Sequence, residues 1–296
     1  MVETFSTSKE SLVPLLALNN KSNKNIIIFP SDKEAKEFAT DFSNLNKNIF
    51  HLPSWDTLSY DSFVPTLDIQ GKRLEIAHLL LTSSNYNISA SIKAISQRIY
   101  FEELEICKIA INEEIDFDLL IENLIHLNYH RKDRVESKGS FAIRGGQLDV
   151  FPINHDLPLR VIFDGDLVNE IKTFDTISQR SISDKNDILI VPANELFHIK
   201  HSDILNLSSN NKENLDDYEL FQYSQNLDLE KCLLGLTSNP TLHIVDKNLI
   251  DYQLNEIIDI EKDTFNNLKQ YFSLGISNFK SRYIDISKYF DNYDTN

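Results

Sequence analysis

The chain has 296 residues, of which 41% are hydrophobic and 25% are charged, and its formal net charge is −16. These values are typical of a globular protein of about two to three domains. The acidic balance argues against a protein that coats nucleic acid with its whole surface, because phosphates repel such a surface.

Targeting signals and paired cysteines are both missing from the sequence. No run of about 18 apolar residues could span a bilayer, and the first residues lack the basic start and apolar core of a signal peptide. Cys107 and Cys232 are the only cysteines, too few for a disulfide framework or a zinc site. The sequence therefore predicts a cytoplasmic protein with no membrane contact.

Strand and helix patterns alternate in the first third of the chain. The apolar run at 25–29 predicts a strand buried on both faces, as in a parallel sheet. Ser31 and Glu34 form a capping box, and the helix they begin has apolar residues at helical spacing as far as Phe42. We expect a strand near 48–52, a helix near 68–81, and a short strand and helix within 88–99. Residues 1–112 thus read as an α/β lobe.

The periodicity changes in the middle of the chain. Asp116 is expected to cap a helix that Asn128 ends in the left-handed conformation. Apolar residues then alternate on both sides of Gly145-Gly146, and Asp164-Gly165-Asp166 gives a strong hairpin signal. A further strand is expected at 187–191. Residues 113–195 are therefore predicted to be an inserted α+β domain.

The last hundred residues carry weaker signals. Segment 208–218 is polar and is expected to be a loop that leads into a helix, and the tail 280–296 has no clear end. We expect residues 196–296 to form a second, truncated α/β lobe. The predicted fold class is α/β: a degenerate helicase-like parallel-sheet lobe, the inserted α+β domain and this partial lobe.

Catalytic and metal-binding patterns are not found. A phosphate-binding loop needs glycines, but none precedes Gly71, and Gly-Lys-Ser/Thr does not occur. His198 and His201 lie three apart without an acidic partner at ligand spacing. Trp55, the only tryptophan, lies in an aromatic stretch that we expect to be a packed loop rather than a platform for bases. We predict no catalytic residues, cofactor or metal.

A basic segment interrupts the acidic chain. Residues 129–144 hold five Lys/Arg and two acidic residues, a local charge of +3. Arginines that are fixed on strands suit bidentate pairing with carboxylates of a partner, which predicts a docking surface. A solvated face and weak, salt-sensitive DNA binding are the alternatives.

Several motifs resemble the N-terminal, excinuclease B-like module of bacterial transcription-repair coupling factor (Mfd). The first is Leu52-Pro53-x-Trp55-Asp56-Thr57-Leu58-x-Tyr60-Asp61-Ser62-Phe63. The second is Gly139-x-Phe141-Ala142-x-Arg144-Gly145-Gly146-x-Leu148-Asp149-x-Phe151-Pro152. The third is Phe174-Asp175-x-x-x-Gln179-Arg180-Ser181. Their order and spacing hold from about residue 25 to residue 197.

The resemblance implies a non-catalytic adaptor of transcription-coupled nucleotide excision repair. Its inserted domain would bind the excinuclease A protein and bring it to a stalled RNA polymerase. Arg144 and Arg160 match the family's partner-binding arginines. Asp164 stands at the position of an aromatic contact, with Phe163 one residue before it, so this contact is either lost or taken over by Phe163 after a change of register.

The resemblance also implies what the chain lacks. The family's polymerase-binding domain and DNA translocase motor leave no trace here, so RNA polymerase and DNA would be reached only through missing C-terminal domains, and we expect a fragment or a remnant. The alternative is an ATP-dependent, helicase-like excinuclease B protein with a DNA-binding role.

Overall fold

The computed structural model describes residues 2–5, 23–44, 48–57, 63–99, 103–197, 232–268, 283 and 286. The predictions for His198, His201 and segment 208–218, and almost all of the tail 280–296, lie outside these residues. The chain divides into two compact units. The first comprises Met1–Pro65, Ile76–Glu102 and Ile199–Asn296, and the second comprises Thr66–Glu75 and Glu103–His198.

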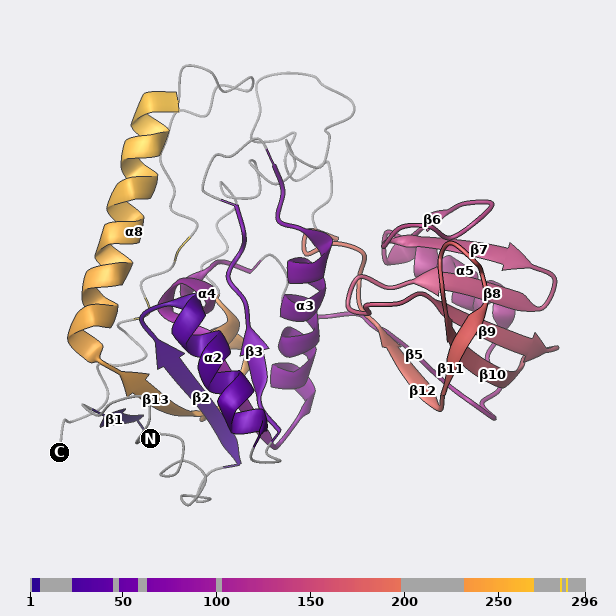
Figure 1. Ribbon diagram of the computed structural model, residues 1–296, viewed down its shortest axis with the longest axis horizontal. Helices are drawn as coiled ribbons and strands as arrows, with labels where there is room; N and C mark the ends of the chain where they lie inside the picture. Colours follow the sequence, from indigo (N-terminus) through magenta and orange to yellow (C-terminus); the bar gives the residue numbers. More distant parts are fainter. Residues whose placement is uncertain are drawn as a thin grey trace. The chain divides into compact units, whose positions relative to one another are not determined.

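The first unit is built on a five-stranded parallel sheet with the strand order β1-β13-β2-β4-β3. Figure 1 shows these strands with helix α2 beside them. The strands are β1 (Val2–Phe5), β2 (Lys24–Phe29), β3 (Phe50–Leu52), β4 (Tyr86–Ser91) and β13 (Thr241–Val245). The helices are α2 (Asp32–Ser43), α4 (Ile92–Ser96), α8 (Lys247–Leu268) and the 3₁₀ turn η1 (Leu233–Leu236), and α3 (Leu67–Thr82) runs through both units. The α/β fold class with a parallel sheet is thus confirmed.

Local sequence signals explain the first βα unit. Strand β2 is almost entirely buried, as its continuous apolar run predicted. The Ser31 hydroxyl accepts from the Glu34 amide at 3.3 Å, which is the Ser31 half of the predicted capping box, and the Glu34 carboxylate accepts from this hydroxyl at 2.8 Å. The apolar positions of α2 are all buried, and the Phe38 ring contacts both Phe29 and Phe42. The predicted packing of Trp55 is also confirmed, since its side chain is 1% exposed.

Residues from the far end of the sequence complete this sheet. Strand β13 pairs in parallel with β1 on one side and with β2 on the other. The sequence predicted a separate lobe from residue 196 onward, but this strand adds to the sheet that the first hundred residues form. The boundaries after residues 112 and 195 stay predictions.

Besides the first half of α3, the described residues of the second unit form a six-stranded sheet, a two-stranded sheet and a further helix. The strand order is β11-β10-β9-β8-β7-β6, and all neighbours are antiparallel except β6 and β7. The strands are β6 (His130–Arg131), β7 (Ser140–Arg144), β8 (Gln147–Phe151), β9 (Leu159–Asp164), β10 (Leu167–Phe174) and β11 (Ser181–Lys185). Strands β5 (Cys107–Ala110) and β12 (Asp187–Ile190) form the antiparallel pair, and the helix is α5 (Phe117–His126).

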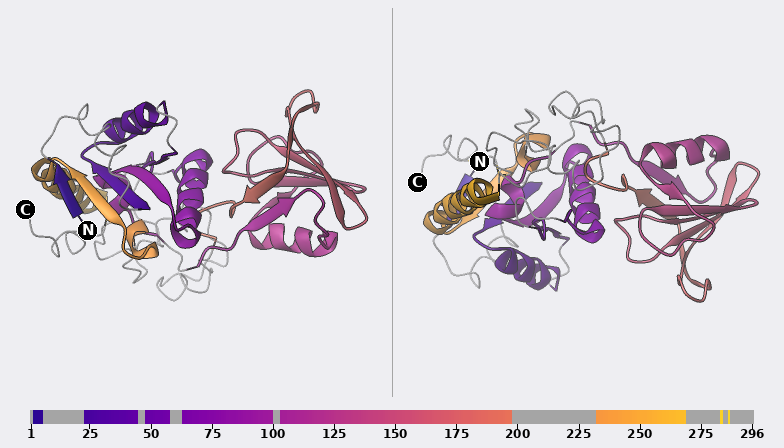
Figure 2. Two further views of the ribbon diagram at one scale, coloured as in Figure 1. Left: turned by 90° about the horizontal axis from the view of Figure 1, so that it is seen from below. Right: turned by 90° about the horizontal axis from the view of Figure 1, so that it is seen from above.

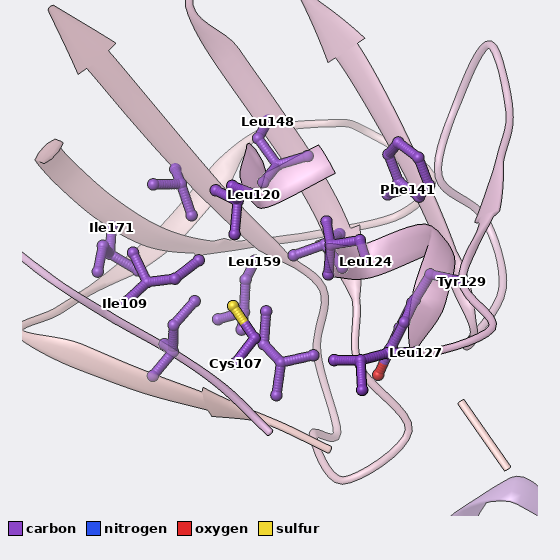
Figure 3. Close-up of a cluster of buried hydrophobic side chains, with 14 of the residues drawn as sticks. Cys107, Ile109, Leu120, Leu124, Leu127, Tyr129, Phe141, Leu148, Leu159 and Ile171 are labelled. Carbon is purple, nitrogen blue, oxygen red and sulfur yellow. The ribbon is translucent and has the colours of Figure 1, made fainter. Parts of the chain in front are cut away.

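The core of this unit lies between one face of the six-stranded sheet and α5 with the β5/β12 pair (Figures 2 and 3). Leu120 and Leu124 of α5 meet Phe141 and Leu148 of the sheet in this cluster. Burial raises the pKa of Cys107, which also lies here, to about 11, so this thiol is a packing residue.

The caps and turns of the second unit follow the sequence. Asp116 caps α5 through the Leu119 amide at 2.9 Å, and Asn128 ends the helix at a φ of 65°. Gly165 turns the β9–β10 hairpin at a φ of 60°. Strands β5 and β11 were not predicted. Strand β5 has only four residues, of which Cys107 and Ile109 are buried, so its alternation is too short to recognise. All five residues of β11 are exposed, so this strand has no apolar alternation.

The first half of α3 packs against the rest of the second unit. A Cβ atom at Gly71 would lie 2.4 Å from the Ile153 carbonyl oxygen, so this helix position needs glycine. Two residues on, Arg73 Nε lies 2.7 Å from Glu195 Oε1, and the two side chains are only 0% and 7% exposed. The Glu195 amide donates to the Gln70 side chain at 2.9 Å. A buried ion pair thus fixes the first half of α3 to Glu195, near the end of the second unit.

Candidate protein-docking face

The six-stranded sheet has one face in the core and one face turned away from it. Side chains alternate along β9, where Leu159, Val161 and Phe163 enter the core, so Arg160 and Ile162 point the other way. Strand register places Lys172 of β10 beside Arg160 and Gln147 of β8 beside Ile162. It also places Arg144 of β7 beside Gln147. We call this side the open face, and its residues include Arg144, Gln147, Arg160, Ile162 and Lys172.

Arg144 is exposed at the end of β7. It precedes the turn at Gly145, whose φ is 61°, and it pairs in register with Gln147. Its Nη2 donates a hydrogen bond to the Asp133 carbonyl oxygen at 3.2 Å. Because Arg has five donor N–H groups, most of this guanidinium remains available to a partner's carboxylate.

Arg160 is held inside the protein. Its Nε and Nη2 donate to the two carboxylate oxygens of Asp149 at 2.8 and 2.9 Å, and its Nη1 donates to the Gln179 carbonyl at 3.2 Å. The guanidinium also stacks over Phe174, 4.6 Å from the ring centroid. The Asp149 hydrogen bonds raise the pKa of Arg160 further. The guanidinium fork is therefore already filled.

The two residues at the predicted aromatic contact lie on opposite sides of the sheet. Phe163 is 7% exposed and packs edge-on against Phe117, with the ring centroids 5.0 Å apart. Asp164 is exposed at the end of β9, beside the Gly165 turn. Of the four predicted partner-binding residues, the structure thus brings Arg144 and Asp164 to the surface and places Arg160 and Phe163 in internal contacts.

The position of a phosphate loop in the first unit holds a carboxylate instead. Only Pro30 and Ser31 separate β2 from α2. The Asp32 carboxylate accepts from the Ser91 hydroxyl at 2.6 Å and from the Ser54 hydroxyl. A connection of two residues is too short to wrap phosphates with successive backbone N–H groups.

Metal and membrane sites receive no support from the described residues. Within the described ranges, no group of three or more His, Cys, Asp and Glu side chains is arranged to hold a metal ion. In the same part of the chain, no helix combines the length and apolar character needed to cross a membrane.

Most of the second unit matches a known protein family. Residues 107–196 match the UvrB interaction domain. We refer to them below as the UvrB-interaction segment. This segment runs from β5 to the residues that follow β12, so it contains the whole core of Figure 3 and the open face.

Curated relatives extend the similarity beyond this segment. The chain is 29% identical to the transcription-repair-coupling factor of Escherichia coli over 174 residues, 57% of this chain and 15% of that protein. It is 29% identical to that of Bacillus subtilis over 189 residues, 61% of this chain and 16% of that protein. It is 23% identical to UvrABC system protein B of Thermosipho africanus over 188 residues, 57% of this chain and 28% of that protein. The resemblance that the sequence motifs predicted is confirmed.

Two features of the open face were missed from the sequence. Asp149 was noted only as part of a motif, although it is 3% exposed and holds Arg160. The loop Asp175–Arg180 was also quoted as a motif without a role. Its Asp and Ser spacing is typical of a turn closed by side-chain hydrogen bonds, which is the signal that could have identified it.

Proposed function

We propose that the UvrB-interaction segment docks the excinuclease A protein and that the chain serves as a non-catalytic adaptor in transcription-coupled nucleotide excision repair. The family match and the similarity to transcription-repair-coupling factors support this proposal. The observation that carries it is the exposed Arg144 on a rigid strand of the open face. In this proposal RNA polymerase and DNA are partners of the domains that the family's longer proteins possess.

The distribution of charge supports an acidic partner. Residues 129–144 carry +3, whereas residues 103–122 carry seven acidic side chains and one lysine, a local charge of −6. The acidic stretch includes the first part of α5, which lies on the core side of the sheet, and the basic stretch leads to Arg144 on the open face. This separation would steer an acidic surface toward the open face.

The four predicted partner residues take different parts in this proposal. Arg144 offers a guanidinium to partner carboxylates, and Asp164 lies at the rim. Arg160 supports the sheet under the interface through Asp149, and Phe163 anchors β9 from the core side. Substituting the first pair would therefore change binding directly, whereas substituting the second pair would change the scaffold.

Exchange of Arg144 for glutamate tests the docking proposal. We expect the dissociation constant for purified excinuclease A protein of the same organism to rise at least about 30-fold, since a central charged contact is typically worth about 2 kcal/mol or more. Isothermal titration calorimetry with the full chain measures it. Lys108→Glu is the matched control, because Lys108 is an exposed cation between core residues Cys107 and Ile109 and so points away from the core on the opposite layer.

The control variant is expected to bind within about twofold of the unchanged chain, less than 1 kcal/mol. Equal losses for Arg144→Glu and Lys108→Glu would mean that only net charge matters. No loss in either variant would contradict docking through the open face.

The alternative of an ATP-dependent, helicase-like protein predicts nucleotide binding by the first unit. We expect titration with ATP and magnesium to give no binding heat and no change in Trp55 fluorescence, because the β2–α2 connection has two residues and Asp32 occupies its end. Saturable binding in the micromolar range would favour the alternative over the adaptor.

A further inference from the structure

The loop between β10 and β11 carries the most exposed large apolar side chain of the described residues. Ile177 is 85% exposed at its tip. Single exposed apolar residues are common on protein surfaces and are usually mobile or neutral. What distinguishes Ile177 is the set of hydrogen bonds that holds the loop presenting it.

Internal hydrogen bonds close this loop on itself. The amide and hydroxyl of Ser178 both donate to Asp175 Oδ1 at 2.7 Å, and these bonds lower the pKa of Asp175. The Gln179 amide donates to the Asp175 carbonyl at 2.8 Å, and the Asp175 amide donates to the Arg180 carbonyl at 3.0 Å. The carboxylate of Asp175 is thus engaged inside the loop.

Two arginines from outside the loop hold its carbonyl groups. Arg134 Nη2 donates to the carbonyls of Thr176 and Ile177 at 2.8 Å each. Arg160 Nη1 donates to the carbonyl of Gln179 at 3.2 Å. Charge-assisted hydrogen bonds of this kind are roughly twice as strong as neutral ones. The tip of the loop is therefore restrained by Arg134, which follows β6, and by Arg160 on the open face.

Backbone strain at Gln179 is a second, independent sign of constraint. Its φ is 60°, and the other non-glycine residues with positive φ in the described ranges are all Asn or Asp, which tolerate this conformation. For a longer side chain this conformation is unfavourable and persists only where surrounding contacts enforce it. Such strain is concentrated at binding and functional sites.

The clamped loop is continuous with Arg144. Arg144 donates to the Asp133 carbonyl, and the next residue, Arg134, donates to the Ile177 carbonyl. Arg134 thus connects the tip to the neighbourhood of Arg144 and also lies 3.6 Å from Glu136 Oε1, while the exposed Arg180 ends the loop. An apolar side chain whose own carbonyl is held by an arginine matches an apolar depression whose rim carries carboxylates.

We propose that Ile177 is a preorganised apolar anchor that inserts into such an acid-rimmed depression on the excinuclease A protein, with Arg134 as the residue that positions it. The proposal rests on the docking function proposed above and adds a contact that determines specificity. Because the loop is already ordered, little conformational entropy is lost when Ile177 is buried. Arg160 contributes by holding Gln179.

Ile177→Ser tests the anchor, and Ile182→Ser is the matched control, since Ile182 is a 57% exposed isoleucine on the adjacent strand β11. Titration of the full chain with purified excinuclease A protein is expected to show about tenfold weaker binding for Ile177→Ser, which is 1.4 kcal/mol, and a change below twofold for Ile182→Ser. Both substitutions are on the surface, so folding should be unaffected.

The positioning role of Arg134 has a readout that does not depend on the partner. Arg134→Met is expected to speed amide hydrogen exchange at Ser178 and Gln179, and trypsin cleavage after Arg180, by about tenfold or more, because two carbonyl contacts are lost. It should weaken binding about fivefold alone and add less than twofold to Ile177→Ser, since both changes act through the same contact.

The outcomes separate this proposal from the docking proposal. If Arg144→Glu weakens binding but Ile177→Ser does not, the anchor is overturned and docking stands. If the unchanged chain fails to bind the excinuclease A protein, both are overturned. Unchanged exchange at Ser178 and Gln179 in Arg134→Met, or full additivity with Ile177→Ser, would remove the positioning role of Arg134.

Discussion

Glu195→Ala is expected to lower the free energy of unfolding of the second unit by about 3–5 kcal/mol, because removal of one partner leaves a buried charge poorly compensated. The carboxylate of Glu195 lies 2.7 Å from Arg73 Nε, and the Arg73 side chain is 0% exposed. Hydrogen exchange of the slowest amides of β8 and β9 measures this loss. Tryptophan fluorescence would not, since the only tryptophan, Trp55, belongs to the first unit.

Two comparisons make the Glu195 result specific. Glu122→Ala removes an exposed carboxylate on α5 and should change stability by less than about 0.5 kcal/mol. The double variant Arg73→Met, Glu195→Leu should be more stable than Glu195→Ala, because apolar residues of similar volume can replace a buried ion pair at little cost. A loss below about 1 kcal/mol in Glu195→Ala would show that this pair does not hold the first half of α3 to the rest of the second unit.

Asp149→Ala is expected to destabilise the second unit by about 3 kcal/mol, the lower end for a buried pair, since the Arg160 side chain keeps 14% exposure. Asp149 accepts from Arg160 at two atoms and from the Gln147 side chain at 3.0 Å, so three hydrogen bonds disappear together. Hydrogen exchange of the slowest amides of β8 and β9 also measures this loss of stability. The freed Arg160 should also release Gln179, so exchange at that amide should quicken.

Asp184→Ala is the control for Asp149. Asp184 is an exposed carboxylate on β11 of the same sheet, and its loss should cost less than about 0.5 kcal/mol. If Asp149→Ala is as stable as the control, Arg160 is free enough to contact a partner itself. That result would return Arg160 to the direct partner-binding role that the family resemblance implies.

Much of the fold could be predicted because its signals are local. The capping box at Ser31, the buried run of β2 and the Asp164-Gly165-Asp166 hairpin depend on residues within a few positions of one another. The missing glycines before Gly71 likewise argue locally against a phosphate loop, and the structure shows a two-residue connection between β2 and α2, which begins at Asp32.

The candidate site could be predicted only in part, because it depends on strand register. The sequence singled out Arg144 and Arg160 equally, as arginines on strands. Register then pairs Asp149 with Arg160, whereas Gln147 stands opposite Arg144. One guanidinium is therefore neutralised inside the protein and the other remains exposed.

The sequence by itself determined the types of most elements from β2 to β12, the charge separation and the lack of a glycine-rich phosphate loop, since each follows from neighbouring residues. Only the tertiary structure decided that β13 joins the first sheet, that Arg73 meets Glu195 and that Arg134 clamps the Ile177 loop. Arg73 and Glu195 are 122 positions apart in the sequence, and Arg134 and Ile177 are 43 apart. The packing of whole faces, which no local pattern encodes, brings such residues together.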